Sequence, residues 1–72
     1  MMFSQWHLGK IKPVHVGVYE RKFRIDKQSF SFWDGKKWSV CSGFASVHIT
    51  RKIHSNYQNL KWRGIVRNES DT

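Results

Sequence analysis

The sequence predicts a small all-β fold, an antiparallel sheet curled into an SH3-like roll or a partly open barrel, with room for one short helix. Three observations predict this fold. Apolar and polar residues alternate with a period of two in several short stretches. An Asp-Gly pair stands between two aromatic stretches, as in a β-hairpin. The 72-residue length allows one thin core and no second domain.

The first predicted strand begins directly after the single proline. Val14, Val16 and Val18 alternate with more polar neighbours, and β-branched residues at a period of two are typical of a half-buried strand. Gly17 within this stretch indicates a bulge or a close backbone approach. Residues 24–28 are mostly polar and are expected to form a turn.

A β-hairpin is predicted over residues 29–40, and two registers compete for it. A two-residue loop would pair Trp33 with Lys36. A three-residue loop, with Gly35 left-handed in a bulge, would leave Trp33 in the loop or on the polar face. We favour the three-residue loop because it separates apolar from polar side chains and gathers one apolar face: Phe30, Phe32, Trp38 and Val40.

The second half of the chain is less regular. The alternation in residues 44–50 favours a strand, although residues 44–54 are also compatible with a short helix. A last strand is predicted around Trp62, with Gly64 as a kink or bulge.

The domain boundaries follow from polarity. We expect one β domain over residues 1–67 and a frayed polar tail over residues 68–72. Met1–Gly9 lacks a charged segment followed by a long apolar stretch, so no signal peptide is predicted. No apolar run approaches the length of a membrane helix, and a cytoplasmic location is expected, in the host if the gene is carried by a phage.

The chain is strongly basic. Thirteen Lys and Arg against five Asp and Glu give a formal net charge of +8. Such a protein attracts polyanions, whether nucleic acid, acidic protein surfaces or anionic lipid.

Neither catalysis nor a cofactor is predicted. One cysteine excludes an internal disulfide, and we interpret Cys41 as a small packing residue. We expect Glu20 to pair with the cations that follow it in sequence, and no glycine-rich phosphate loop is present. No metal site is predicted, because zinc-ligand spacing is lacking among the available groups: His7, His15, His48, His54 and Cys41.

Nucleic-acid binding is the strongest chemical hypothesis. Basic residues interleave with aromatic residues in three stretches, 19–24, 33–37 and 57–63. Phosphates need cations and unstacked bases need flat rings, so a β surface that carries both suits single-stranded DNA or RNA. We assign Phe30, Phe32, Trp38 and Trp62 to the core. The predicted binding residues are Trp33, Lys36, Lys37, Arg21, Lys22, Arg24, Tyr19, Tyr57, Lys61 and Arg63.

Residues 6–38 resemble a pattern found in small uncharacterised phage and prophage proteins. That pattern is a Trp, a Pro, then Gly-x-Tyr-Glu, and then an aromatic-Trp-Asp-Gly-x-x-Trp hairpin. It is matched here by Trp6, Pro13, residues 17–20 and residues 32–38. The resemblance implies a mobile-element origin and an accessory protein that binds and blocks a host machine, including nucleic-acid-guided immune complexes.

Two classes of partner therefore remain open. The chain is expected to bind nucleic acid or a host nucleoprotein complex. Alternatively, it inhibits a host defence protein without touching nucleic acid, in the manner of an anti-CRISPR protein, since Trp, Tyr and Arg also dominate protein–protein hot spots. A structural virion component is a third class, which would oligomerise. A membrane surface is the weakest partner, because no amphipathic basic helix is present.

Overall fold

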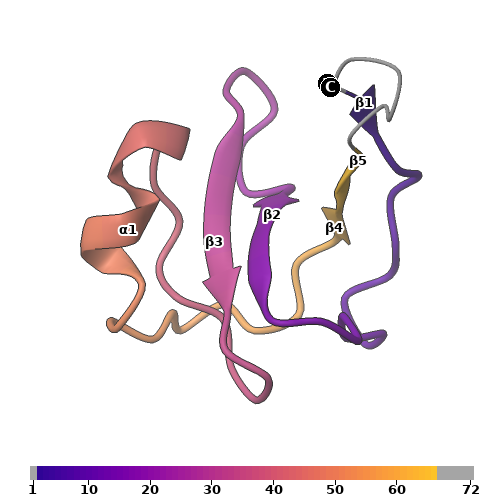
Figure 1. Cartoon of the computed structure of the whole chain (residues 1–72). Coiled ribbons are helices and arrows are strands. Elements are labelled where there is room, and N and C mark those ends of the chain that lie inside the picture. The colour runs from indigo at the N-terminus through magenta and orange to yellow at the C-terminus, as the bar shows by residue number, and fades with distance from the viewer. Residues whose placement is uncertain (1, 67–72) are drawn as a thin grey trace.

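The computed structural model describes residues 2–66, so the predicted tail at 68–72 lies outside the described residues. Strands and short helices follow one another along the chain (Figure 1). They are β1 (Met2–Phe3), β2 (Gly17–Arg21), β3 (Ser29–Trp33), the 3-10 helix η1 (Phe44–Ser46), α1 (Val47–Thr50), β4 (Trp62–Arg63) and β5 (Ile65–Val66).

The central strand is β2, which pairs antiparallel with β3 on one side and with β4 on the other. A second antiparallel pair joins β1 to β5. The predicted fold class, a small antiparallel sheet with a short helix, is confirmed, and this sheet is not closed into a barrel. Gly64 lies between β4 and β5, at the position of the predicted kink or bulge.

The first strand is shorter than its valine pattern predicts. β2 begins only at Gly17, and Val14 is 91% exposed. Val16 is also exposed, so only Val18 of the three valines lies in the strand. The prediction of a strand from Val14 is therefore wrong. The alternation of apolar and polar residues continues toward the N-terminus beyond Gly17. Gly17 already pairs with Trp33, the last residue of β3, so β3 offers no partner to the residues before Gly17.

A cluster of tryptophans forms the core on one face of the sheet. Trp33, Trp38 and Trp62 are buried there, and Tyr19 packs against them edge-on. The expected burial of Trp38 and Trp62 is confirmed. The expected exposure of Trp33 is wrong, because its side chain is 4% exposed and its ring centroid lies 5.0 Å from that of Trp38.

The hairpin register explains the burial of Trp33. Trp33 pairs with Trp38 across a four-residue loop, so both predicted registers are wrong. The Asp34 side chain stabilises this longer loop, because its Oδ1 accepts hydrogen bonds from the backbone N–H groups of Lys37 (2.7 Å) and Lys36 (2.8 Å). These donors hold the pKa of Asp34 below its ordinary value.

Gly35 is the position in this loop that most requires glycine. Its φ is +100°, as the predicted left-handed conformation requires. We expect Gly35→Val to destabilise the fold by about 1–3 kcal/mol, since a β-branched residue is strained at positive φ. Urea denaturation measures the loss. Gly43→Val is the matched control, because Gly43 has an extended backbone and open space around its Cα. Equal losses in the two variants would contradict the conformational argument.

Residues 44–50 form η1 and α1, so the favoured strand is wrong and the alternative helix is confirmed. The reason is packing on the face of β3 opposite the tryptophans. Val47 is buried, and Phe44 meets Phe30 edge-on with ring centroids 5.0 Å apart. The guanidinium of Arg51 lies 4.3 Å from the ring centroid of Phe32. The helical segment therefore covers the β3 half of that face and leaves the β2–β4 half uncovered.

Candidate functional site

The predicted binding residues lie at two opposite ends of the sheet. β2 and β3 run antiparallel, so Lys22 and Arg24 follow one end of the strand pair, whereas Lys36 and Lys37 lie in the loop at the other end (Figure 1). The four residue steps of β2 separate these ends by about 13 Å. The two groups of cations are therefore not adjacent, and binding of one partner to both groups stays a prediction.

Arg21 is a core residue and does not belong to a binding surface. Its side chain is 1% exposed, because strand alternation turns it toward the tryptophan face. The guanidinium lies 4.3 Å from the ring centroid of Trp38 and donates hydrogen bonds to the Tyr57 carbonyl (2.6 Å) and the Ser31 hydroxyl (3.4 Å). Burial lowers the pKa of Arg21 to about 10, so the group stays cationic at neutral pH.

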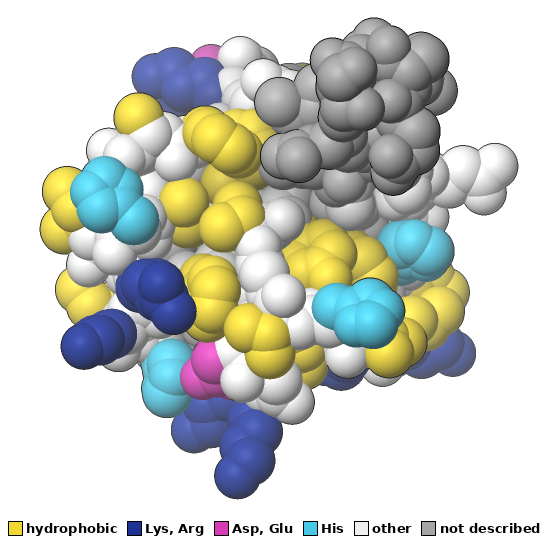
Figure 2. Space-filling view, in the orientation of Figure 1, with side chains coloured by type: hydrophobic (Ala, Val, Ile, Leu, Met, Phe, Trp, Pro, Cys, Tyr) yellow, Lys and Arg dark blue, Asp and Glu magenta, His cyan; other side chains and the backbone are white. Residues whose placement is uncertain are grey.

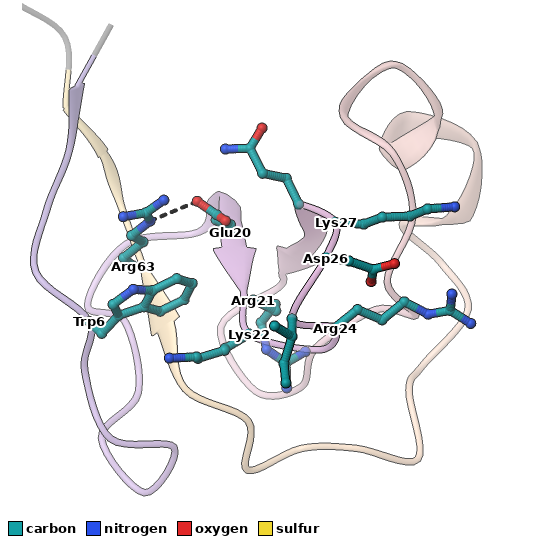
Figure 3. A pocket seen from close by; sticks show the side chains of 10 residues that line it. Trp6, Glu20, Arg21, Lys22, Arg24, Asp26, Lys27 and Arg63 are labelled. Carbon is teal, nitrogen blue, oxygen red and sulfur yellow. Dashed lines mark hydrogen bonds and ion pairs between the residues drawn. The ribbon is translucent and has the colours of Figure 1, made fainter.

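A hollow of about 610 Å³ opens on the half of the sheet that the helix leaves uncovered. We call it the Trp6 hollow, and Figure 3 shows side chains from several elements around it. With Arg21 left out, because its guanidinium is buried on the other face of the sheet, four cationic and two acidic residues line the hollow, a net charge of +2. Its lining residues are Trp6, Glu20, Arg21, Lys22, Arg24, Ile25, Asp26, Lys27, Gln28 and Arg63.

Trp6 reaches this hollow from the stretch that pairs with β4. His7 forms the backbone bridge to Trp62 and stacks on its ring with centroids 4.3 Å apart. Neighbouring residues in an extended stretch point to opposite faces, so Trp6 lies on the other side. The Arg63 guanidinium lies 4.6 Å and the Lys22 ammonium 5.5 Å from the Trp6 ring centroid. The ring is therefore held between cations.

The hollow also contains a buried carboxylate. Glu20 is 5% exposed, and its Oε1 accepts a hydrogen bond from Arg63 Nε at 2.7 Å (Figure 3). Glu20 and Arg63 are paired residues on β2 and β4. The expectation that Glu20 pairs with the cations next to it in sequence is replaced by this cross-strand ion pair, which only the strand register creates.

A second hollow lies on the other side of the loop that connects β2 to β3. We call it the Phe23 hollow; it measures about 310 Å³, and it shares Arg24, Lys27 and Gln28 with the Trp6 hollow. Phe23 is exposed at its wall, and the exposed ring of Tyr57 lies beside Phe23, outside the lining, with ring centroids 5.5 Å apart. The expected exposure of Tyr57 is confirmed. The remaining lining residues of the Phe23 hollow are Phe23, Ser29, Cys41, Ser42 and Gly43.

Of the two remaining predicted binding residues, Lys61 is accessible to a ligand, whereas Tyr19 is half-buried. Lys61 is exposed, and its carbonyl accepts a hydrogen bond from the Lys22 N–H, so it adds a cation at the same end of the sheet. Tyr19 is half-buried, and its hydroxyl donates to the His15 carbonyl at 2.7 Å. Burial raises the pKa of Tyr19. Its ring faces Trp38 and Trp62, so Tyr19 is not an exposed platform.

Sequence reasoning missed Trp6, Glu20 and Lys27 as members of the site. In the sequence, Trp6 belongs only to the phage-like pattern. A signal for it existed in the sequence, since an aromatic residue one position from His7 must lie on the opposite face of an extended stretch. The pairing of that stretch with β4, which brings it to Glu20, had no local signal.

The described residues contain no group of three or more His, Cys, Asp or Glu side chains able to hold a metal ion. Among residues 2–66, no helix has both the length and the apolar character needed to cross a membrane. Comparison with protein families, with curated proteins and with solved structures finds no match to this chain.

Proposed function

We propose that the chain is a non-enzymatic binding protein that takes up single-stranded nucleic acid at the end of the sheet where β2 runs into the Lys22–Gln28 loop. The observation that carries the proposal is the pair of hollows on the two sides of this loop. Without the buried Arg21, the Trp6 hollow has a net charge of +2, and each hollow has an aromatic residue at its wall.

The arrangement suits an unpaired strand that crosses the loop. Arg24 and Lys27 border both hollows, so they are placed to contact phosphates wherever the strand crosses. The Phe23 and Tyr57 rings are exposed and offer flat surfaces for unstacked bases. Base stacking on aromatic rings contributes about 1–3 kcal/mol per base and tolerates any sequence. A duplex would keep its bases stacked inside and would use only the cations.

In this proposal the protein acts by occupying its target. A phage-type accessory protein of this kind would cover a host strand or the exposed nucleic acid of a host nucleoprotein complex. No chemistry on the bound strand is required, and the binding site needs no cofactor.

A second candidate function is inhibition of a host protein, and exposed apolar side chains favour it. Ile25 is 103% exposed at the loop apex, between Arg24 and Asp26. Figure 2 shows hydrophobic side chains across the middle of one face, with Lys and Arg around them. An apolar anchor beside cations fits an acidic protein surface with a hydrophobic pocket, whereas phosphate binding does not need it.

We expect the triple variant Lys22→Gln, Arg24→Gln, Lys27→Gln to lose most of its affinity for single-stranded oligonucleotides. Each lost phosphate contact reduces the slope of log affinity against log salt by about 0.7 for a single strand, so the slope should fall by about two units. Fluorescence anisotropy at several salt concentrations measures this slope, with a duplex of the same length as a comparison.

The matched control is Lys36→Gln, Lys37→Gln, Lys52→Gln, which removes the same charge at exposed positions outside both hollows. It should keep the wild-type slope. If both triple variants lose affinity equally, the net charge of the protein accounts for oligonucleotide binding and the proposed site is wrong. If the wild type binds no oligonucleotide at low salt, nucleic-acid binding is wrong and the protein-inhibitor function is favoured.

A further inference from the structure

We propose that Glu20 makes the Trp6 hollow selective for an unpaired guanine base. This inference rests on the proposed function, since it names the nucleotide that the same site prefers. It begins from a carboxylate that a simple phosphate site would not contain.

Glu20 is out of place in a hollow that only binds phosphate. A carboxylate in the lining repels phosphate oxygens, and burial of 95% of its surface strengthens that repulsion by removing water. The same carboxylate attracts groups that donate hydrogen bonds. The hollow therefore offers two chemistries, cations that contact a backbone and one buried acceptor that receives a donor.

The carboxylate has capacity for a ligand beyond its ion pair. An ionised carboxylate offers about four lone-pair sites on its two oxygens. The hydrogen bond from Arg63 Nε to Oε1 uses one of these sites. It also fixes the orientation of the carboxylate, because Arg63 is itself held on β4 directly across from Glu20. A fixed acceptor reads a base edge better than a mobile one, since no conformational freedom is lost on binding.

Guanine is the base whose edge matches a carboxylate. Its Watson–Crick edge carries two adjacent donors, N1–H and the 2-amino group, and a carboxylate accepts such a pair in a bidentate manner. Cytosine and adenine present one amino group beside an acceptor nitrogen. Uracil presents one N–H between two carbonyl oxygens, which a carboxylate repels. This edge is accessible only when guanine is unpaired, which agrees with a single-stranded ligand.

Trp6 and the surrounding cations complete the recognition. The Trp6 ring forms a wall of the same hollow, so a base that reaches Glu20 lies beside an aromatic surface. Lys22, Arg24 and Lys27 line the hollow around it and are placed for the adjoining phosphates. A volume of about 610 Å³ leaves room for a base together with part of its backbone.

The test uses the wild-type protein and five oligouridine strands that differ only at one central position: guanine, hypoxanthine, adenine, cytosine or uracil. A single guanine avoids self-association of guanine-rich strands. We expect the guanine strand to bind about 10- to 100-fold more tightly than the uracil strand, the range of one bidentate base contact. Hypoxanthine lacks only the 2-amino group and should lose most of that advantage.

The variant Glu20→Gln keeps the size of the side chain and removes its charge. It should bind the all-uridine strand at least as tightly as the wild type, because a charge that repels phosphate and uracil oxygens is removed, while guanine and uracil become nearly equal. Thermal unfolding measures whether the variant is folded. If it is not folded, the comparison of the guanine and hypoxanthine strands in the wild type still tests whether the site recognises the 2-amino group of guanine.

Each result has one meaning. Equal binding of all five strands by the wild type overturns the guanine inference and leaves the proposed nucleic-acid function standing. A guanine preference that persists in Glu20→Gln shows that another residue reads the base. An equal loss for every strand in that variant shows that Glu20 only holds Arg63 in place. Binding of no strand contradicts the proposed function itself.

Discussion

Trp38→Ala should cost about 3–5 kcal/mol of folding free energy, the range for removal of a large buried aromatic side chain. Trp38 is 0% exposed. Its ring contacts Trp33, Trp62 and Tyr19, and the Arg21 guanidinium lies over it. Removal of the indole leaves a cavity in the centre of the core. It also leaves a buried cation without the ring that partly compensates its lost hydration.

The expected consequence is a chain that is largely unfolded at room temperature. A domain of this size has a stability near the low end of about 5–15 kcal/mol. Circular dichroism and urea denaturation measure the effect. Trp38→Phe is the comparison that should still fold, since it keeps a ring and removes an indole N–H that has no hydrogen-bond partner within the described residues. An unchanged urea midpoint for Trp38→Ala would contradict the central role of this ring.

Gly9→Ala should destabilise the fold by about 3 kcal/mol, the upper end of the range for an overpacked core. Gly9 is buried, and a Cβ there would overlap the backbone carbonyl of Asn59. The close approach is held by Lys12, whose ammonium donates hydrogen bonds to the Gly9 carbonyl at 2.7 Å, to the Gln58 carbonyl, and to the Asn59 side chain at 3.1 Å. Because the obstructing atoms are backbone, no side-chain rotation relieves the overlap.

Gly43→Ala is the matched control for this prediction. No atom lies within 4 Å of the position a Cβ would take at Gly43, and its φ of −65° suits any residue. Alanine there should be neutral or should stabilise by about 0.4–1 kcal/mol, through a less flexible unfolded chain. Urea midpoints of the two variants provide the comparison. If Gly9→Ala unfolds at the same urea concentration as Gly43→Ala, the close backbone approach at Gly9 does not exist.

Local patterns predicted those parts of the fold whose causes are local. The Asp34-Gly35 turn follows from the capping side chain and the positive φ that glycine tolerates. The interruption at Gly64 and the burial of Trp38 and Trp62 likewise follow from residue type. The exact register did not, because loops of two, three or four residues are compatible with the same local sequence, and the observed register is the one that packs Trp33 against Trp38.

The candidate site was predicted in part. Lys22, Arg24 and Arg63 line the Trp6 hollow, as interleaved cations and aromatics indicated. The sequence predicts a surface position for Trp33, because it stands next to a turn, and for Arg21, because it stands in a run of cations. Strand parity instead places both side chains among the tryptophans of the core.

Residue types and local periodicity are enough to predict the all-β class, the positive charge and one small core rich in aromatic residues. These properties depend on residue type and on the spacing of residues that are close together in the sequence. Which cations share a surface depends on contacts between distant segments of the chain. Lys22 and Lys36 belong to opposite ends of the sheet, while Trp6, Glu20 and Arg63 come together from distant parts of the chain. The reason is that strand pairing between distant segments is set by the packing of the whole core, and one residue of register exchanges the buried face for the exposed one.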